Sequence, residues 1–203
     1  MYEIYLGIKR KWSISRISRE IEVSATTVLR EIRRNSNANG YNPLEINLKN
    51  VVSKNVTVKN CKFANFSNNA MTVFGMAEGG VLNIENNTFT LGKTSEAVRI
   101  SNKTNTKFTI NVKDCSYTYP TDAAGQGVGF FLFEDHTSKT AEEANAAMQF
   151  KNLKVNVDNV TFEGAKVTKL NLFSGARNQF ACMYYDKSGY VVDATHFPTF
   201  NFK

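Results

Sequence analysis

The sequence predicts a mainly β protein: a right-handed parallel β-solenoid of about four rungs, preceded by a small all-α helix-turn-helix. Apolar residues follow helical spacing over residues 1–46, and a strand-forming segment recurs from residue 47 onward. The chain changes from one pattern to the other without a linker. We therefore expect two domains, 1–46 and 47–203, the second with an inserted helix near 138–149 and a C-terminal capping segment.

Charge is distributed unevenly along the chain. The formal net charge of the 203 residues is +7, and residues 1–46 carry eight Lys/Arg against five Asp/Glu. Less than a quarter of the chain therefore holds +3 of the excess, which favours a polyanionic partner such as nucleic acid. A hydrophobic content of 42% indicates a globular chain with a core, not a disordered one.

Targeting, membrane and metal-binding motifs are not visible. No apolar run approaches the roughly 18 residues that span a bilayer, and the first residues lack the apolar core of a signal peptide. The three cysteines have no CxxC spacing, so we expect small buried hydrophobes and neither disulfides nor a metal site. We expect no cofactor and no membrane partner, and a cytoplasmic (nucleoid-associated) or virion location.

Helical spacing predicts short helices in residues 1–46. The apolar blocks are Ile4 and Ile8, then Ile14, Ile17 and Ile21, then Val28 and Ile32. Ser15 is expected to cap a helix that reaches about residue 21, and Ser24 to cap another that runs from residue 25 towards residue 34. A short helix, a tight turn formed by "EVS" and a second helix is the helix-turn-helix arrangement, in which the second helix enters the major groove.

Side chains suited to DNA lie on the last of these helices. Thr26 and Thr27 stand at its start, where hydroxyls can reach base edges or phosphates. Arg30, Arg33 and Arg34 follow on its later turns and suit phosphates or guanine edges. These five residues are the predicted DNA-binding residues.

The same stretch resembles a known family. "SISRISREIEVSATTVLREIRRNS", followed by "GY" at residues 40–41, is similar to the N-terminal helix-turn-helix of insertion-sequence transposases, over about residues 3–46. The resemblance implies sequence-directed DNA binding through the same threonines and arginines. Such transposases continue into a ribonuclease-H-like core with three spaced carboxylates, and nothing after residue 46 resembles that core.

A repeat predicts the architecture of the rest. The aligned segments are "VTVKNCKF" (56–63), "LNIENNTF" (82–89), "INVKDCSY" (110–117) and "VNVDNVTF" (155–162), with start-to-start offsets of 26, 28 and 45 residues. Second strands are expected at "AMTVFG" (70–75), "AVRISN" (97–102), "VGFFLF" (128–133) and "KLNLFS" (169–174). One rung cannot bury its apolar face alone, so successive rungs are expected to stack.

Stacking predicts two columns of equivalent residues. One column is aromatic: Phe63, Phe89, Tyr117 and Phe162. The other is a turn ladder of Asn60, Asn86, Asp114 and Asn159, because Asn tolerates left-handed backbone and bonds to its neighbours. Cys61 and Cys115 would lie two rungs, or about 9–10 Å, apart, too far for a disulfide. The pattern is similar to right-handed parallel β-helices of the pectate-lyase and phage-tailspike type.

The ends of such a stack need covering, since an edge strand exposes unpaired backbone groups. The aromatic C-terminal segment is expected to close one end through a hairpin around "DKSG". At the other end the repeat begins abruptly near residue 48, as if the β region were the tail of a longer solenoid. That open edge is expected to be covered by the helical domain, another subunit or a missing partner.

Catalytic residues are not expected. The acid/base candidates are Asp114, Asp122, Glu134, Asp135, His136 and His196. The consecutive residues Glu134, Asp135 and His136 could form a site on a loop, but they are more typical of a solvated strand end. The sequence contains no catalytic triad spacing, phosphate loop or dinucleotide fingerprint.

Three functions fit these patterns. The first is a non-enzymatic protein that binds duplex DNA through its helix-turn-helix and uses the solenoid as an assembly or partner module. The second is a structural virion or surface protein, such as a phage capsid decoration, head fibre or tail component, whose helical head is a docking element or a relic. The third is a β-helix enzyme that acts on polysaccharides.

Overall fold

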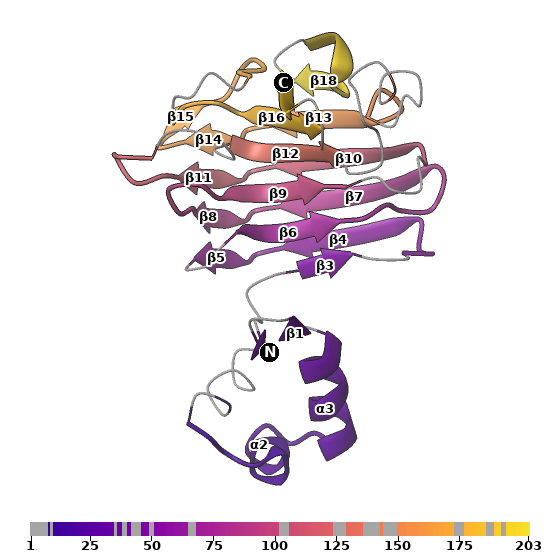
Figure 1. Cartoon of the computed structure of the whole chain (residues 1–203), viewed down its shortest axis with the longest axis vertical. Coiled ribbons are helices and arrows are strands. Elements are labelled where there is room, and N and C mark those ends of the chain that lie inside the picture. Colours follow the sequence, from indigo (N-terminus) through magenta and orange to yellow (C-terminus); the bar gives the residue numbers. More distant parts are fainter. Residues whose placement is uncertain are drawn as a thin grey trace. The chain divides into compact units, whose positions relative to one another are not determined.

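The computed structural model describes residues 8, 10–34, 36–37, 40–41, 46–48, 51–64, 68–101, 106–123, 129–135, 143, 150–172, 177–185, 189–191 and 194–203. In this part of the chain the protein is mainly β, with two α-helices and sheets that are largely parallel (Figure 1). The chain divides into two compact units, Met1–Ile46 and Asn47–Lys203, called here the N-terminal unit and the β unit. Apart from Glu143, the helix predicted near 138–149 lies outside the described residues.

The N-terminal unit contains α2 (Ile14–Glu20), α3 (Ala25–Arg34) and a two-stranded antiparallel ladder of β1 (Ser36–Asn37) and β2 (Gly40–Tyr41). The prediction that Ser15 caps the first of these helices is wrong. The Ser13 hydroxyl accepts a hydrogen bond from the Arg16 backbone N–H at 3.2 Å, so α2 begins at Ile14. The earlier start places Ile14 inside the helix, where it packs against the same core as its neighbours.

Tight packing between the two helices sets the core of this unit. Ile17 of α2 and Val28 of α3 are 1% and 0% exposed. Five partly buried residues pack around this pair: Ile8, Trp12, Ile14, Ile21 and Ile32. The turn uses Glu22 in left-handed conformation (φ 55°), and the Thr27 N–H donates to the Ser24 hydroxyl at 3.1 Å, which confirms Ser24 as the cap of α3.

The β unit is built from three sheets. Sheet 1 contains β4 (Asn55–Lys59), β7 (Gly80–Glu85), β10 (Phe108–Lys113), β13 (Lys154–Asp158) and β18 (Thr199–Phe202). Sheet 2 contains β5 (Lys62–Ala64), β8 (Thr88–Thr90), β11 (Ser116–Thr118), β14 (Thr161–Phe162) and β15 (Ala165–Lys166). Sheet 3 contains β3 (Ile46–Leu48), β6 (Asn69–Val73), β9 (Glu96–Ile100), β12 (Gly129–Asp135), β16 (Ala181–Tyr185) and β17 (Gly189–Val191).

From β4 to β14 the chain visits sheets 1, 2 and 3 in turn, and each visit adds a strand beside the previous one (Figure 1). The last visits to sheets 2 and 3 add the antiparallel pairs β14–β15 and β16–β17. The repeats pair in parallel in the register that their alignment predicts: Val56 with Leu82, Leu82 with Ile110, and Ile110 with Val155. Phe200 of β18 continues this column, so a fifth segment that sequence alignment missed joins sheet 1.

The predicted turn ladder is confirmed at the corner between sheets 1 and 2. Its members have left-handed backbone, with φ of 58°, 49°, 53° and 50° at Asn60, Asn86, Asp114 and Asn159. The Asn86 amide donates to Asn60 at 2.9 Å, and the Asn159 amide donates to Asp114 at 2.7 Å. Asparagine and aspartate are favoured here because their side chains tolerate this conformation and bond across the rungs.

The predicted aromatic column is also confirmed. Phe63 and Phe89 stack with ring centroids 5.0 Å apart, and Tyr117 and Phe162 lie 4.9 Å apart. Phe130 of sheet 3 packs edge-on against Phe89 at 5.3 Å and against Tyr117 at 5.4 Å. The column therefore joins sheets 2 and 3 into one core, in which each of these rings except that of Phe162 is buried.

Two further sets of asparagine amides bond the rungs together. On sheet 1 the amides of Asn111, Asn156 and Asn201 each donate to the asparagine of the preceding repeat, beginning with Asn83, at 2.8–3.0 Å. Asn87, which is 1% exposed, accepts from the Cys61 N–H and donates to the Val58 carbonyl, both at 2.9 Å. Backbone groups at the rung corner thus find partners from the next rung.

One predicted strand is wrong. "KLNLFS" (169–174) contributes only an isolated bridge, between Leu172 and Ala181, and residues 173–174 are not described. The strand that pairs with β12 is β16, whose first residues Ala181, Cys182 and Met183 are fully buried. The chain first turns back through the β14–β15 hairpin. In the described part of "KLNLFS", Lys169 is exposed and residues 170–172 are only partly buried, and a later apolar segment enters sheet 3.

The two ends of the stack differ. The predicted C-terminal hairpin is confirmed, because β17 pairs antiparallel with β16. β15 likewise pairs antiparallel with β14, and Arg177 holds this hairpin by bonding Glu163 and stacking 5.4 Å from the Phe162 ring. At the other end, β4 and β5 are the edge strands of sheets 1 and 2. Cys115 and Cys182 are buried, as predicted, whereas Cys61 is only partly buried.

Candidate functional site

The first turn of α3 exposes polar side chains to solvent, and the residue that follows them packs into the core of the N-terminal unit. Thr26 and Thr27 are exposed, whereas Val28, the next residue, is completely buried. The Thr27 hydroxyl lies 2.9 Å from the Ser24 hydroxyl, so the cap also orients this side chain. Arg30, Arg33 and Arg34 belong to α3, but their side chains lie outside the described residues.

A second basic feature, which the sequence analysis did not single out, lies around Trp12. The guanidinium carbons of Arg16 and Arg10 lie 4.2 Å and 5.2 Å from the Trp12 ring centroid. Arg10, Trp12 and Glu20 also line a pocket whose floor includes Ile17 and Ile21. The signal in the sequence was one tryptophan with an arginine on either side, "RKWSISR".

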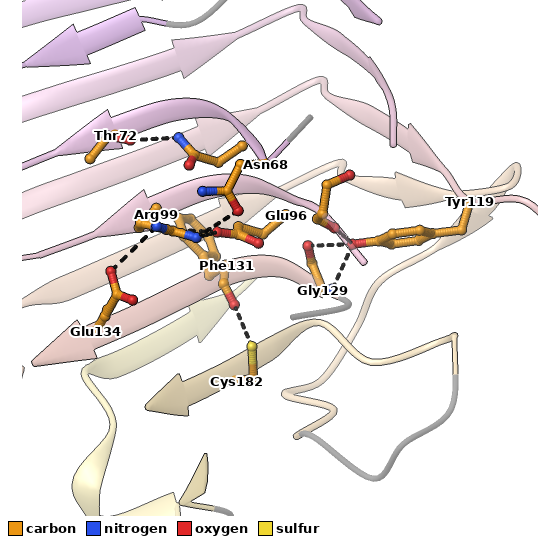
Figure 2. Close-up of polar contacts among 11 residues, drawn as sticks. Asn68, Thr72, Glu96, Arg99, Tyr119, Gly129, Phe131, Glu134 and Cys182 are labelled. Atoms are coloured by element: carbon orange, nitrogen blue, oxygen red, sulfur yellow. Dashed lines mark hydrogen bonds and ion pairs between the residues drawn. The ribbon is translucent and has the colours of Figure 1, made fainter. Parts of the chain in front are cut away.

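A buried ionic network occupies sheet 3 (Figure 2). Glu96, which is 1% exposed, accepts a hydrogen bond from Arg99 Nε at 2.8 Å and forms an ion pair with Arg99 Nη2 at 2.7 Å. The same guanidinium lies 3.6 Å from Glu134 on β12 and donates to Asn68 at 2.9 Å. The network therefore spans β9, β12 and the residue that precedes β6.

Electrostatics in this network follow from burial. Desolvation raises the pKa of Glu96 from 4.5 to about 7, although Arg99 lowers it, and the nearby Glu134 adds to the rise. Burial likewise raises the pKa of the Cys182 thiol, whose sulfur lies 3.7 Å from the Phe131 carbonyl. A thiol held protonated in this way is an inert core group and a poor nucleophile.

The Tyr119 hydroxyl forms hydrogen bonds with the backbone at the first residue of β12 (Figure 2). Its hydroxyl accepts from the Gly129 N–H at 2.6 Å and donates to the carbonyl of Ser95, immediately before Glu96. Burial raises the pKa of this hydroxyl above its ordinary range. The tyrosine therefore links the entry of two neighbouring strands as a neutral donor and acceptor.

The acid/base candidates are distributed over separate elements, and those with described side chains already have partners. Asp114 belongs to the turn ladder, Asp122 forms an ion pair with Lys93, and Glu134 faces Arg99. The side chain of Asp135 and the whole of His136 lie outside the described residues. His196 lies in η1 (Ala194–His196), beside the Thr195 hydroxyl at 3.5 Å.

Two other kinds of site are absent from the described residues. They contain no helix that is long and apolar enough to cross a membrane. They also contain no group of three or more His, Cys, Asp or Glu side chains placed to hold a metal ion. Comparison of the chain with protein-family models, curated proteins and solved structures finds no match.

Proposed function

We propose that the protein is a non-enzymatic DNA-binding protein whose N-terminal unit is a helix-turn-helix. The observation that carries this proposal is the arrangement of α2 and α3. A tight turn joins the two helices, Ile17 and Val28 lock them together, and Thr26 and Thr27 face solvent at the start of α3. This is the arrangement in which a second helix contacts base edges with its first turn, and Arg30, Arg33 and Arg34 extend it with positive charge.

The β unit, in this proposal, is a right-handed parallel β-solenoid that serves as an assembly or partner module. The fixed order in which the chain visits the three sheets supports it, as do the aligned asparagine and aromatic columns. Such a unit supplies a rigid surface for a partner, and this role requires no catalytic residues.

Loss of the α3 arginines is expected to weaken DNA binding. In the full chain, Arg30→Ala combined with Arg33→Ala removes two phosphate or base contacts and should weaken binding about 30-fold or more. Fluorescence anisotropy with labelled duplex DNA, measured over a salt series, gives both the affinity and its salt dependence.

Lys113→Ala with Lys154→Ala is the matched control, because it removes the same charge from exposed positions of the β unit. The control should bind like the wild type. If both double variants lose the same affinity for DNA, the binding depends on overall charge and not on α3. If the wild-type chain binds no duplex DNA at low salt, the proposal is contradicted.

A second candidate function has its own observation. β14 and β16 are covered by antiparallel strands at one end of the stack, whereas β4 and β5 end sheets 1 and 2 at the other. Parallel edge strands are templates for pairing with another chain. Sheet 1 ends on the parallel strand β18 at the first of these ends, so the contrast holds for sheet 2. The edge formed by β4 and β5 favours a structural role, such as a component of a virion, in which this edge pairs with a second copy of the chain.

Proline in β4 is expected to prevent such pairing. Val81 N–H donates to the Lys54 carbonyl and Asn60 N–H donates to that of Glu85, so the alternate N–H of Thr57 points away from β7. Thr57→Pro removes this outward donor and should convert an oligomer into a monomer in sedimentation velocity. Thr57→Ala keeps the N–H and should leave the oligomer intact. A wild type that is monomeric at every concentration would exclude the edge as a self-association site.

A further inference from the structure

Trp12 holds two arginine side chains in fixed positions on the N-terminal unit. Its ring is half-buried and packs against the core formed by Ile17 and Val28, so its orientation is set by the interior of the unit. Arg16 and Arg10 lie over this ring, with guanidinium carbons 4.2 Å and 5.2 Å from its centroid. Cation–π contact orients both guanidinium groups before any partner arrives.

The local backbone explains why the two arginines meet at one ring. Lys11 adopts left-handed conformation (φ 55°), and its N–H bonds the Ile8 carbonyl at 2.9 Å, which turns the chain sharply before Trp12. Arg10 precedes this turn, and Arg16 lies in the first turn of α2. Both side chains are exposed at their own positions.

Both cations are available to an external anion. Within the part of the chain that the structure describes, neither guanidinium forms an ion pair, whereas Arg99 and Arg177 each face a carboxylate. Arg10 and Trp12 line the adjoining pocket together with Glu20, which is the one acidic residue among its described lining residues. Oriented, unpaired guanidinium groups suit phosphate, which they bind through planar, bidentate hydrogen bonds.

We propose that Arg10, Trp12 and Arg16 form a clamp for backbone phosphates of duplex DNA. The inference rests on the proposed function and adds a site to it: α3 contacts base edges, and the clamp, placed on the segment that leads into α2, fixes the duplex by its phosphodiesters. Phosphate contacts set the register of a protein on DNA and carry no sequence preference. The clamp therefore supplies affinity and orientation, and α3 supplies selectivity.

The salt dependence of binding tests the clamp directly. Each phosphate contact contributes about 0.9 to the slope of log affinity against log salt concentration. Arg10→Ala with Arg16→Ala should therefore lower the slope by about 1.8. Affinity should fall equally for duplexes of different sequence. Lys113→Ala with Lys154→Ala, which removes the same charge elsewhere, should leave the slope at the wild-type value.

Substitution of the ring separates stacking from charge. Trp12→Leu keeps an apolar side chain and both arginines but removes the π face that holds them, so affinity should fall about 5- to 30-fold. Trp12→Phe keeps an aromatic face and should bind within a few-fold of the wild type. Circular dichroism of the helices checks that both variants remain folded. If the folded Trp12→Leu and Trp12→Phe variants lose the same affinity, stacking on the aromatic face does not contribute to DNA binding.

The outcomes separate this inference from the proposed function. If the wild-type chain binds no duplex DNA at low salt, both proposals fail together. If it binds and the Arg10/Arg16 double variant retains the wild-type slope, the clamp is overturned while DNA binding by α3 stands. Because Trp12 is the single tryptophan of the chain, quenching of its fluorescence by DNA gives an independent signal from this site.

Discussion

Replacing Arg99 with alanine is expected to lower the free energy of unfolding of the β unit by about 3–5 kcal/mol. Arg99 is the countercharge of Glu96, a carboxylate that is 1% exposed, and it also faces Glu134. At pH 8, above the folded pKa of Glu96, removal of Arg99 leaves the buried carboxylate without its countercharge, which is costly. The hydrogen bond to Asn68, which precedes the neighbouring strand, is lost as well.

Urea unfolding followed by the circular dichroism of the strands measures this loss, while fluorescence of the single tryptophan reports separately on the N-terminal unit. Lys93→Ala is the matched control, because the Lys93–Asp122 pair is 65% and 59% exposed and solvent screens it, so its loss should change stability little. Arg99→Met with Glu96→Gln removes both charges and should recover much of the stability. Equal effects of Arg99→Ala and Lys93→Ala would show that the network contributes no more than a surface pair.

Glu96→Gln is expected to remove a pH dependence of stability between about pH 4.5 and 7. Burial raises the pKa of Glu96 in the folded protein from 4.5 to about 7. Within this window the folded state binds more protons than the unfolded state, so the free energy of unfolding falls as pH rises. The stabilisation is fully present below pH 4.5 and is lost by about pH 7, by up to about 3 kcal/mol.

The measurement is the free energy of unfolding of the wild type and of Glu96→Gln at several pH values across this window. The difference between the two proteins should change with pH, since all other titrating groups are shared. Glu85→Gln, at a half-buried position of β7, is the control that removes a carboxyl group outside the network. Parallel curves for Glu96→Gln itself would contradict the raised pKa.

Much of the β unit was predictable because its physics is local and repeated. Alternation placed Leu82, Ile84 and their equivalents on one side of sheet 1, and stacking fixed their register. The left-handed turn at Asn60 and its equivalents follows from the tolerance of Asn and Asp for that conformation. In the N-terminal unit, isoleucine spacing and Ser24 predicted the helices and one cap for similar reasons.

Other features depend on contacts between distant segments. "KLNLFS" has the alternation of a strand, but after the β14–β15 hairpin Lys169 is exposed and Leu170 only partly buried, whereas residues 181–183 are buried in sheet 3. Glu96 and Arg99 stand in an apolar strand, and nothing local reveals that Glu134, from the next rung, joins them. Ser13 displaced Ser15 as a cap because the helix start that buries Ile14 was favoured by packing.

The repeat, its columns, the two-helix head and the residue types suited to DNA could be predicted from the sequence, because periodicity and turn chemistry are properties of neighbouring residues. Three features emerged only from the folded chain: the segments that fill sheet 3, the pairing of the buried carboxylate with its guanidinium, and the arginines that lie against Trp12. These features depend on burial and on contacts between side chains from different repeats or from the two sides of a turn. Such contacts set the desolvation and packing energies, and the spacing of residues in the sequence does not reveal them.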